Sequence, residues 1–243
     1  MLGLFGAAPR YRVTINPRAR RLRLRVQGGE VMVTAPPGCP AAMIERFVSE
    51  HRPWIERRQA HYADLTRHHP TDGLRHGACL PVRHGAVALN LIASEGKRLR
   101  IVDAGKRLDV LVPCGFDVSG EQNALRAALR RHLRASALAE SRRLAHAFAA
   151  HGLVPNEIRT SDARTLWGSC SSTGSVKVNW RLIFAPEAVH AYVVAHELAH
   201  LRLRDHSARY WAVVEQLDPA WRRKRDWLKR HGEAIIHGTR VWI

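Results

Sequence analysis

The stretch AYVVAHELAHLRLRDHS, residues 191–207, contains the pattern H-E-x-x-H at residues 196–200 and a further histidine, His206. Two histidines four positions apart on a helix lie about one turn from each other on the same face, so both imidazoles can bind one metal ion. Glu197 projects about 100° around the helix axis and can reach a metal-bound water without becoming a ligand. A third nitrogen ligand from beyond the helix would leave a fourth position open, as in catalytic zinc sites. The pattern therefore predicts metal-assisted hydrolysis.

The surroundings of the motif strengthen this prediction. Residues 191–195 are mostly apolar, so we expect a buried helix. Burying two histidines and a glutamate without a partner costs several kcal/mol, and a metal ion removes that cost by using their polar atoms. Pro186 and Glu187 suit the start of a helix, which we predict over about residues 187–201. The alternative is a polar helix whose histidines are solvated or hydrogen-bonded in the core.

The third ligand has several candidates. His206 lies directly before Ser207, a predicted N-cap for a helix over about residues 208–217, so its backbone would be held in place. Glu215, on that following helix, is a rival. Asp205 fits better as an acceptor that orients a histidine. We favour His206.

The segment before the motif predicts a strand. Apolar residues alternate with polar ones over residues 175–184, directly after the turn residues Thr173 and Gly174. A strand that runs into a metal-binding helix suggests a sheet edge on which a peptide substrate could lie. The alternative is an ordinary hairpin of an α+β domain.

Three further residues are candidates for contact with substrate. A hydrolase of this kind needs a group that stabilises the developing negative charge. Arg181 and Tyr210 are candidates because they lie close to the motif in the sequence, and Asn179 completes the predicted substrate-binding set.

Three segments carry a resemblance to a known family. Together they closely resemble the YgjP-like zinc metallopeptidase family, relatives of the SprT-type zincins. The resemblance is strongest over about residues 120–235 and weaker in the amino-terminal half. The segments are LWGSCSSTGSVKVNWRLIFAP (166–186), VVAHELAHLRLRDHSARYW (193–211) and LDPAWRRKRDWLKR (217–230).

The resemblance implies a zincin-like metallohydrolase domain. Its Zn²⁺ would be held by His196, His200 and His206, and Glu197 would be the general base that activates a zinc-bound water. Family members are named metallopeptidases by fold, while a bacterial member is associated with hydrolysis of UTP to UMP and pyrophosphate. The expected substrate is therefore a peptide or a nucleotide. A metallopeptidase-like hydrolase is the first expectation, and a nucleoside triphosphate (UTP) pyrophosphatase using the same zinc site is the alternative.

The charge of the chain adds a third alternative, a zinc-stapled nucleic-acid-binding module without catalysis. The net charge is +18 and the pI about 11.2, which predicts weak binding of nucleic acid or other polyanions. The excess is spread evenly over residues 1–118 and 119–243. No G-x-x-x-x-G-K loop occurs, so phosphate recognition would rest on side chains. Glu197 argues against a purely structural site, which has no need of that acid.

Cysteines and hydropathy bear on location. The four cysteines are dispersed without C-x-x-C spacing, so we expect no disulfide framework and a cytoplasmic protein. No apolar run approaches the roughly 18 residues of a spanning helix, so we expect no membrane association.

The chain as a whole is predicted to be α+β, with a boundary near residue 118. Residues 1–118 would form a β-rich module with one helix, over about residues 40–63 and kinked at Pro53. Its second predicted strand, residues 22–26, exposes alternate arginines, which we interpret as a solvated face rather than a nucleic-acid surface. Residues 119–243 would form the zincin-like catalytic domain. It would end in an amphipathic helix, residues 221–230, whose basic side chains face solvent.

Overall fold

A computed structural model describes residues 9–27, 29–66, 73–82 and 85–242 of the chain. The fold is α+β, as predicted, and the chain forms two compact units, Met1–His68 and His69–Ile243. The predicted boundary near residue 118 falls inside the second unit.

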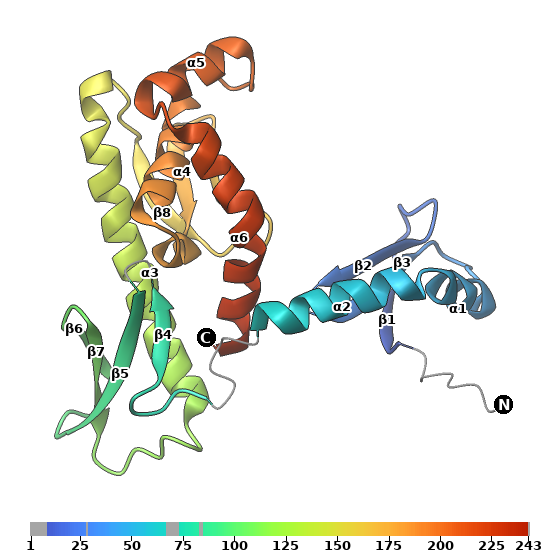
Figure 1. Ribbon diagram of the computed structural model, residues 1–243, viewed down its shortest axis with the longest axis horizontal. Coiled ribbons are helices and arrows are strands. Elements are labelled where there is room, and N and C mark those ends of the chain that lie inside the picture. The colour runs from blue at the N-terminus through green and yellow to red at the C-terminus, as the bar shows by residue number, and fades with distance from the viewer. Residues whose placement is uncertain (1–8, 28, 67–72, 83–84, 243) are drawn as a thin grey trace. The chain divides into compact units, whose positions relative to one another are not determined.

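The first unit is a three-stranded sheet with two helices on one face (Figure 1). Strand β3 is central, antiparallel to β2 and parallel to β1. Alternation turns Val31 and Val33 inward, where they pack against Ile44, Val48 and Ile55 of the helices. The elements are β1 (Tyr11–Ile15), β2 (Arg23–Gln27), β3 (Glu30–Ala35), α1 (Ala41–Glu50) and α2 (Arg52–Thr66).

The helix expected over residues 40–63 is two helices rather than one kinked helix. The chain turns at His51, the C-cap of α1, and α2 begins at Arg52. Pro53 therefore lies in the first turn of α2, where its missing N–H costs nothing.

The second unit contains two sheets joined by a long helix. Its four-stranded sheet has the order β4-β5-β7-β6, and its three-stranded sheet has the order β8-β10-β9. The elements before the motif are β4 (Cys79–Val82), β5 (Gly85–Ser94), β6 (Arg100–Asp103), β7 (Arg107–Pro113), α3 (Gln122–Ala147), η1 (Ala149–His151), β8 (Glu157–Ser161), β9 (Gly168–Cys170), β10 (Ser175–Asn179) and η2 (Trp180–Phe184). The later ones are α4 (Glu187–Ala199), α5 (Ala208–Leu217) and α6 (Trp221–Trp242).

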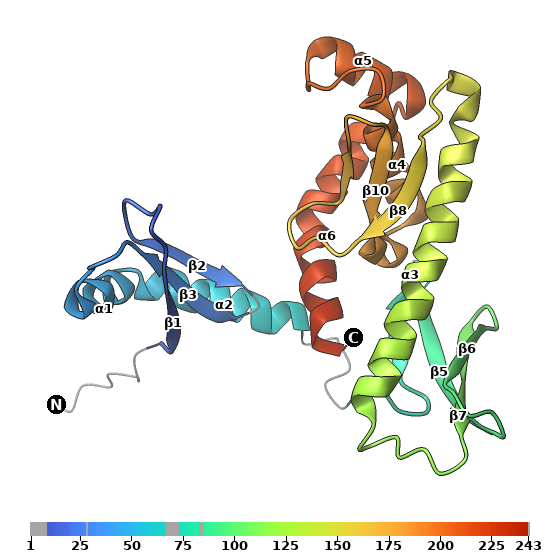
Figure 2. The ribbon, with the colours of Figure 1, turned by 180° about the vertical axis from the view of Figure 1, so that it is seen from behind.

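Helix α3 is the reason that residues 69–118 belong with the carboxy-terminal part. Its first half packs Leu125 and Leu129 against Leu89 of the four-stranded sheet. Its second half packs Leu144 into the core around Val193 of α4. Figures 1 and 2 show α3 running beside both sheets. One continuous helix thus ties together two cores that the sequence pattern suggested were separate.

The predicted strand over residues 175–184 is shorter than expected. Strand β10 ends at Asn179, and residues 180–184 form the 3-10 helix η2 because the Asn179 side chain accepts a hydrogen bond from the Arg181 N–H at 3.1 Å. The predicted free edge is also wrong, because β8 and β9 pair with the two sides of β10. The end strand next to α4 is β9.

Two sequence-based expectations concern cysteines and membranes. All four cysteines, Cys39, Cys79, Cys114 and Cys170, are free thiols. Within the described ranges, no helix has the length and apolar character needed to cross a membrane.

Candidate metal centre

The H-E-x-x-H motif lies on the most deeply buried helix of the second unit. Helix α4 packs Val194, Ala195 and Leu198 completely inside the core. A hydrogen bond of 2.9 Å between Ser141 Oγ of α3 and His190 Nε2 fixes the helix from the side. His196 and Glu197 belong to α4, and His200 is its C-cap. The helix thus presents its polar residues at a defined place in an apolar environment.

His206 joins the two histidines of the helix. The chain reverses after α4 and enters α5, where Ser207 is the N-cap and accepts from the Tyr210 N–H at 3.4 Å, as predicted. The ring centroids of His196, His200 and His206 lie 4.8–5.3 Å apart. One nitrogen of each ring lies within 4.8 Å of the others, and the three could hold a metal ion.

The protonation states suit a metal site. His200 Nδ1 lies 3.0 Å from the Leu203 carbonyl oxygen, which can only accept, so Nδ1 donates and Nε2 keeps its lone pair. His196 Nε2 lies 3.4 Å from His206 Nε2. Burial, together with His200, His206 and Arg225, lowers the pKa of His196 to about 3. His196 is therefore a neutral imidazole at pH 7, the form that binds metal.

His196 also carries an orphaned polar atom. Its Nδ1 is buried, and no hydrogen-bond partner for it occurs in the described part of the chain. Rings of Tyr192, Tyr210 and Trp211 surround the imidazole at centroid distances of 5.3–6.0 Å. An imidazole surrounded by aromatic rings has few hydrogen-bond partners, so a metal at Nε2 would offset the cost of removing it from water. The donor set fits a zinc ion, which prefers nitrogen ligands of this kind.

The rival ligands lie elsewhere. Glu215 accepts hydrogen bonds from Trp221 Nε1 at 2.5 Å and from Arg222 at 2.8 Å. It therefore stabilises the start of α6. Asp205 accepts from the Ser207 N–H at 3.3 Å. We expected Asp205 to orient a histidine, but the acceptor that orients His200 is the Leu203 carbonyl oxygen.

Glu197 lines the same cavity as His196. Its side chain is 5% exposed, and burial raises its pKa to about 8. Strand β9 passes directly over it at Gly168. A Cβ atom at that position would lie 2.5 Å from Glu197 Oε1 and 2.6 Å from its Cγ. Only glycine lets the strand approach the carboxyl group this closely.

A cavity of about 310 Å³ opens beside Glu197 and His196. Its walls come from the segment before β9, from α4 and from α6. The lining residues are Thr165, Leu166, Trp167, Gly168, Tyr192, Val193, His196, Glu197, Arg225, Leu228 and Lys229. Trp167 packs so closely on α6 that a Cβ at Gly232 would lie 2.7 Å from its ring. The shape of the cavity therefore depends on Gly168 and Gly232, because at each of them a neighbouring side chain lies too close for a Cβ atom.

The three predicted substrate-binding residues do not line this cavity. Asn179 is buried and donates to the carbonyl oxygens of Ala163 and Leu166 at 2.8 and 3.0 Å. Arg181 bonds to Asp162 at 2.5 Å and to Thr239 at 2.7 Å. Both residues hold the loop that leads into β9, so they shape the cavity wall from behind.

Tyr210 also acts within the fold. Its hydroxyl donates to the His196 carbonyl oxygen at 2.8 Å, and its ring stacks on His200 at a centroid distance of 4.5 Å. It thereby links α5 to the two histidines of α4 and holds them in place.

Sequence reasoning missed the contribution of α6. The basic residues of its first part were expected to face solvent, and Arg225 and Lys229 are exposed. Both also lie at the cavity wall, one turn apart on the helix, which the sequence pattern did not predict. The Arg225 guanidinium lies over the rings of Trp211 and Trp221, at 5.2 and 5.9 Å from their centroids. The i, i+4 spacing of these cations around the buried Leu228 was the available signal.

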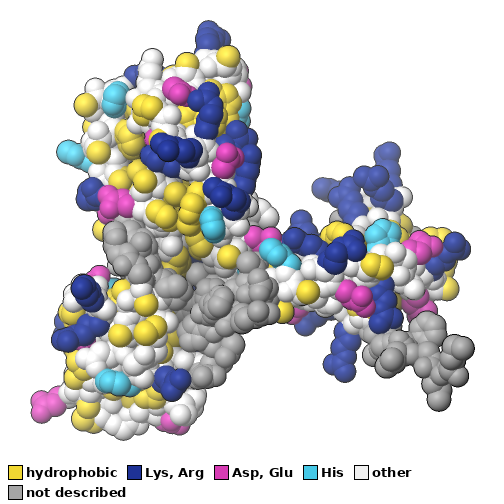
Figure 3. All heavy atoms as spheres, in the orientation of Figure 1, with side chains coloured by type: hydrophobic (Ala, Val, Ile, Leu, Met, Phe, Trp, Pro, Cys, Tyr) yellow, Lys and Arg dark blue, Asp and Glu magenta, His cyan; other side chains and the backbone are white. Residues whose placement is uncertain are grey.

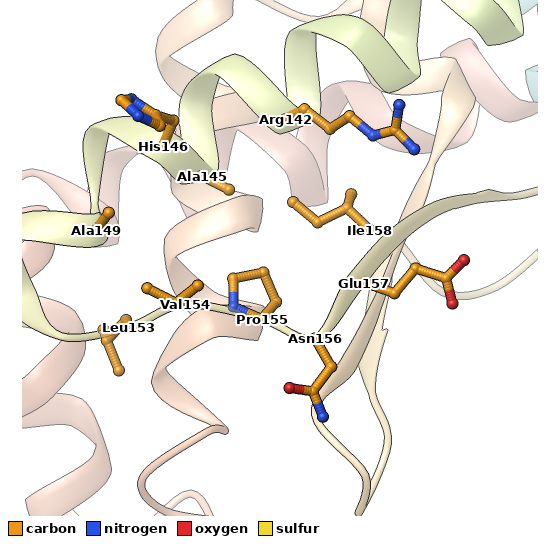
Figure 4. A pocket seen from close by; sticks show the side chains of 10 residues that line it. All are labelled: Arg142, Ala145, His146, Ala149, Leu153, Val154, Pro155, Asn156, Glu157 and Ile158. Atoms are coloured by element: carbon orange, nitrogen blue, oxygen red, sulfur yellow. The ribbon is translucent and has the colours of Figure 1, made fainter.

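A second cavity, of about 360 Å³, lies between the end of α3 and β8 (Figure 4). Apolar side chains such as Leu153 and Ile158 form much of its lining, and Arg142, His146 and Glu157 complete it. It shares no lining residue with the cavity beside Glu197.

Comparison with known proteins assigns the family. The profile of the family described as "YgjP-like, metallopeptidase domain" matches residues 20–231. The chain belongs to the YgjP-like family. Membership supports a metal-dependent hydrolase as its general activity, and the histidine cluster of this YgjP-like domain agrees with a metal, typically zinc. No curated protein and no solved structure matched the chain.

Gly168→Ala tests the close approach of β9 to Glu197. The added methyl group overlaps the carboxyl group, so we expect a loss of about 1–3 kcal/mol in the free energy of unfolding, measured with denaturant. In a Glu197→Ala background the overlap disappears, and Gly168→Ala should then cost clearly less. Ser169→Ala, at the exposed neighbouring position, is the matched control. Equal costs in both backgrounds would contradict the contact.

The metal-free protein should lose stability between pH 6.5 and 8. The folded pKa of Glu197 is about 8 against 4.5 in the unfolded chain, so the native state holds the extra proton and stability falls as pH rises through this window. His196, with a folded pKa of about 3 against 6.5, acts in the opposite direction but only below pH 6.5. The decline should approach about 1.4 kcal/mol per pH unit.

Chelator-treated protein and its Glu197→Gln variant should be unfolded with denaturant across this pH range. The variant cannot ionise at position 197, so its stability should stay level from pH 6.5 to 8. A wild-type curve as level as that of the variant would refute the raised pKa.

Proposed function

We propose that the protein is a zinc-dependent, metallopeptidase-like hydrolase in which His196, His200 and His206 bind the metal and Glu197 is the general base. The observation that supports this most is the cluster of three imidazoles, one of which, His196, lines the same cavity as the buried carboxyl group of Glu197. Three protein ligands leave a zinc position open, which is the arrangement of catalytic sites. When bound, the metal supplies Lewis-acid activation of water and of the attacked carbonyl or phosphoryl oxygen.

Glu197 supplies the proton transfer. It lines the cavity next to His196, and no hydrogen bond to its carboxylate occurs among the described residues. Its oxygens are thus free to accept the proton of the attacking water and to pass it to the leaving group. Trp167 and Tyr192 form apolar walls of the cavity beside this carboxyl group.

A peptide substrate would lie along β9. This strand is the end strand of its sheet, and its first residue, Gly168, lines the cavity. A free strand edge pairs with an extended peptide through backbone hydrogen bonds, which need no particular side chain. The scissile bond would then lie against Glu197, where β9 comes closest to α4.

The second candidate activity is a nucleoside triphosphate pyrophosphatase that acts on UTP. Arg225 and Lys229 are the two cations that line the cavity, and Glu197 is its only acidic side chain among the described residues. The guanidinium of Arg225 rests on two indole rings, which pre-orders it for a charged, bidentate contact with phosphate. Side-chain recognition of this kind replaces a glycine-rich phosphate loop.

A purely structural zinc site has less support. Structural sites are closed by four protein ligands, whereas the described residues bring together three. In a purely structural site, Glu197 would have no role that offsets the cost of burying it. Its raised pKa reflects that desolvation cost.

Glu197→Gln should retain zinc and lose nearly all turnover, because the amide fills the same space but cannot accept the proton. His200→Ala should lose both zinc and turnover. Metal content by atomic absorption and hydrolysis assays on the purified full chain separate the two effects. Wild-type turnover in Glu197→Gln would show that the general base lies elsewhere.

Pyrophosphate release from UTP by the zinc-loaded protein distinguishes the two substrate classes. If UTP is the substrate, Arg225→Gln should lower kcat/KM about 10- to 100-fold, the value of a charge-assisted hydrogen bond. Arg223→Gln removes an exposed arginine of the same helix, one that does not line the cavity, and should have little effect. Peptide cleavage without UTP turnover would assign the site to the peptidase reaction instead.

A further inference from the structure

The outer face of the first unit's sheet carries a row of arginines. The register pairs Arg12 of β1 with Met32 of β3, and Met32 with Arg25 of β2. The next row pairs Thr14 with Thr34, and Thr34 with Arg23. Because side chains at paired positions lie on the same side of a sheet, these six residues form one surface. We call it the arginine face.

The arginine face is turned away from the helices. Val31 and Val33, which alternate with Met32 and Thr34 along β3, pack into the core with α1 and α2. The face is therefore the uncovered side of the sheet. Arg12, Arg23 and Arg25 are exposed there. From the opposite, helix side, Figure 3 shows further dark blue Lys and Arg side chains projecting from this unit.

The charges of the face are not neutralised. Within the described residues, no ion pair or hydrogen bond involves the side chain of Arg12, Arg23 or Arg25. Glu30, the first residue of β3, is the one acidic residue of the three strands. Residues 1–68 hold 12 arginines against 5 acidic residues, so the rest of the unit does not compensate. The field over this face is positive.

The sequence pattern alone favoured a solvated face here, but the six-residue surface and its unpaired charges support a different interpretation. We propose that the arginine face binds the phosphate backbone of a nucleic acid duplex. Guanidinium groups match phosphate oxygens with two parallel hydrogen bonds. Adjacent strands lie about 4.8 Å apart, so Arg12 and Arg25 stand about 10 Å from each other across β3, with Arg23 about 7 Å along the strand from Arg25. The hydroxyl groups of Thr14 and Thr34 add neutral donors to phosphate between them.

The side chains of the arginine face indicate which kind of polyanion it binds. Single-stranded binding depends on aromatic side chains that stack on bases, and the face has none. A membrane surface would use apolar side chains that enter the lipid, and Met32 is the only one here. The arginine face offers positive charge but no aromatic side chains to stack on bases and few apolar ones to enter a membrane. These properties favour a duplex that is bound through its phosphate backbone, independently of its base sequence.

The test measures the affinity of the full chain for a short, labelled DNA duplex of mixed sequence at several salt concentrations. If the three arginines contact phosphates, the triple variant Arg12→Gln, Arg23→Gln, Arg25→Gln should bind more weakly. Its plot of log affinity against log salt should be less steep by about 2.7, since each phosphate contact contributes about 0.9. From about 50 to about 200 mM salt, the wild type should lose about 40-fold more affinity than the variant.

The control keeps the same change in net charge. Arg46→Gln, Arg57→Gln and Arg98→Gln replace three exposed arginines that lie outside the arginine face, and this variant should keep the wild-type slope. Equal losses in the two triple variants would overturn the proposal, because binding would then follow net charge alone. An unchanged slope in the face variant would also overturn it and would point to another basic surface, such as α6.

Further measurements test the folding of the variant, the kind of ligand, and the independence of this surface from the hydrolytic site. Circular dichroism and zinc content of the face variant should match the wild type, and Arg25→Gln alone, whose slope should fall by about 0.9, serves if the triple variant does not fold. Vesicles with anionic headgroups should bind more weakly than the duplex. Tighter binding to vesicles, or to a single strand of the same sequence, would refute a duplex as the ligand. Glu197→Gln should bind the duplex as the wild type does, which separates this surface from the hydrolytic site.

Discussion

The burial of polar groups on α4 is the constraint on which the second unit depends. An apolar helix that contains two imidazoles and a carboxyl group loses hydration free energy when it enters the core, and the surroundings must offset that loss. His196 remains neutral there, Glu197 holds its proton in the metal-free state, and His200 is oriented by a backbone carbonyl. His196 Nδ1 is buried without a hydrogen-bond partner among the described residues, and a metal ion held by this imidazole would offset the cost of burying it. The same burial that costs stability thus creates the chemistry.

Several contacts from the elements around α4 hold its polar residues in place. Tyr210 links α5 to the carbonyl of His196, and Asn179 and Arg181 hold the loop that leads into β9. That loop ends at Gly168, where the strand crosses over Glu197 without room for a side chain. A substitution that shifted any of these contacts would move the Glu197 carboxyl group relative to the histidines. The site is therefore a product of the whole unit, including the long helix α3 that connects its two cores.

The two units use charge in opposite ways. In the second unit, an acid is forced into the interior and its ionisation is suppressed by desolvation. In the first unit, arginines project from an open sheet face into water, where they keep their full charge and have no carboxylate partners among the described residues. Buried charge suits catalysis, because its proton affinity can be tuned. Exposed and unpaired charge suits electrostatic attraction of a polyanion.

The sequence by itself determined the α+β class, the course of α4 and α5, the Ser207 cap and the grouping of three histidines with Glu197. These depend on local periodicity, capping and spacing along one helix and the turn after it, which residues close in sequence decide. It did not determine that β10 is a central strand, that Asn179 and Arg181 support a loop, or that Arg225 reaches the cavity. Those facts come from pairings and packing between residues far apart in the chain. Only the tertiary structure decided them. The partner of a polar residue near the motif depends on which distant segment of the chain packs against it, and the local sequence does not contain that information.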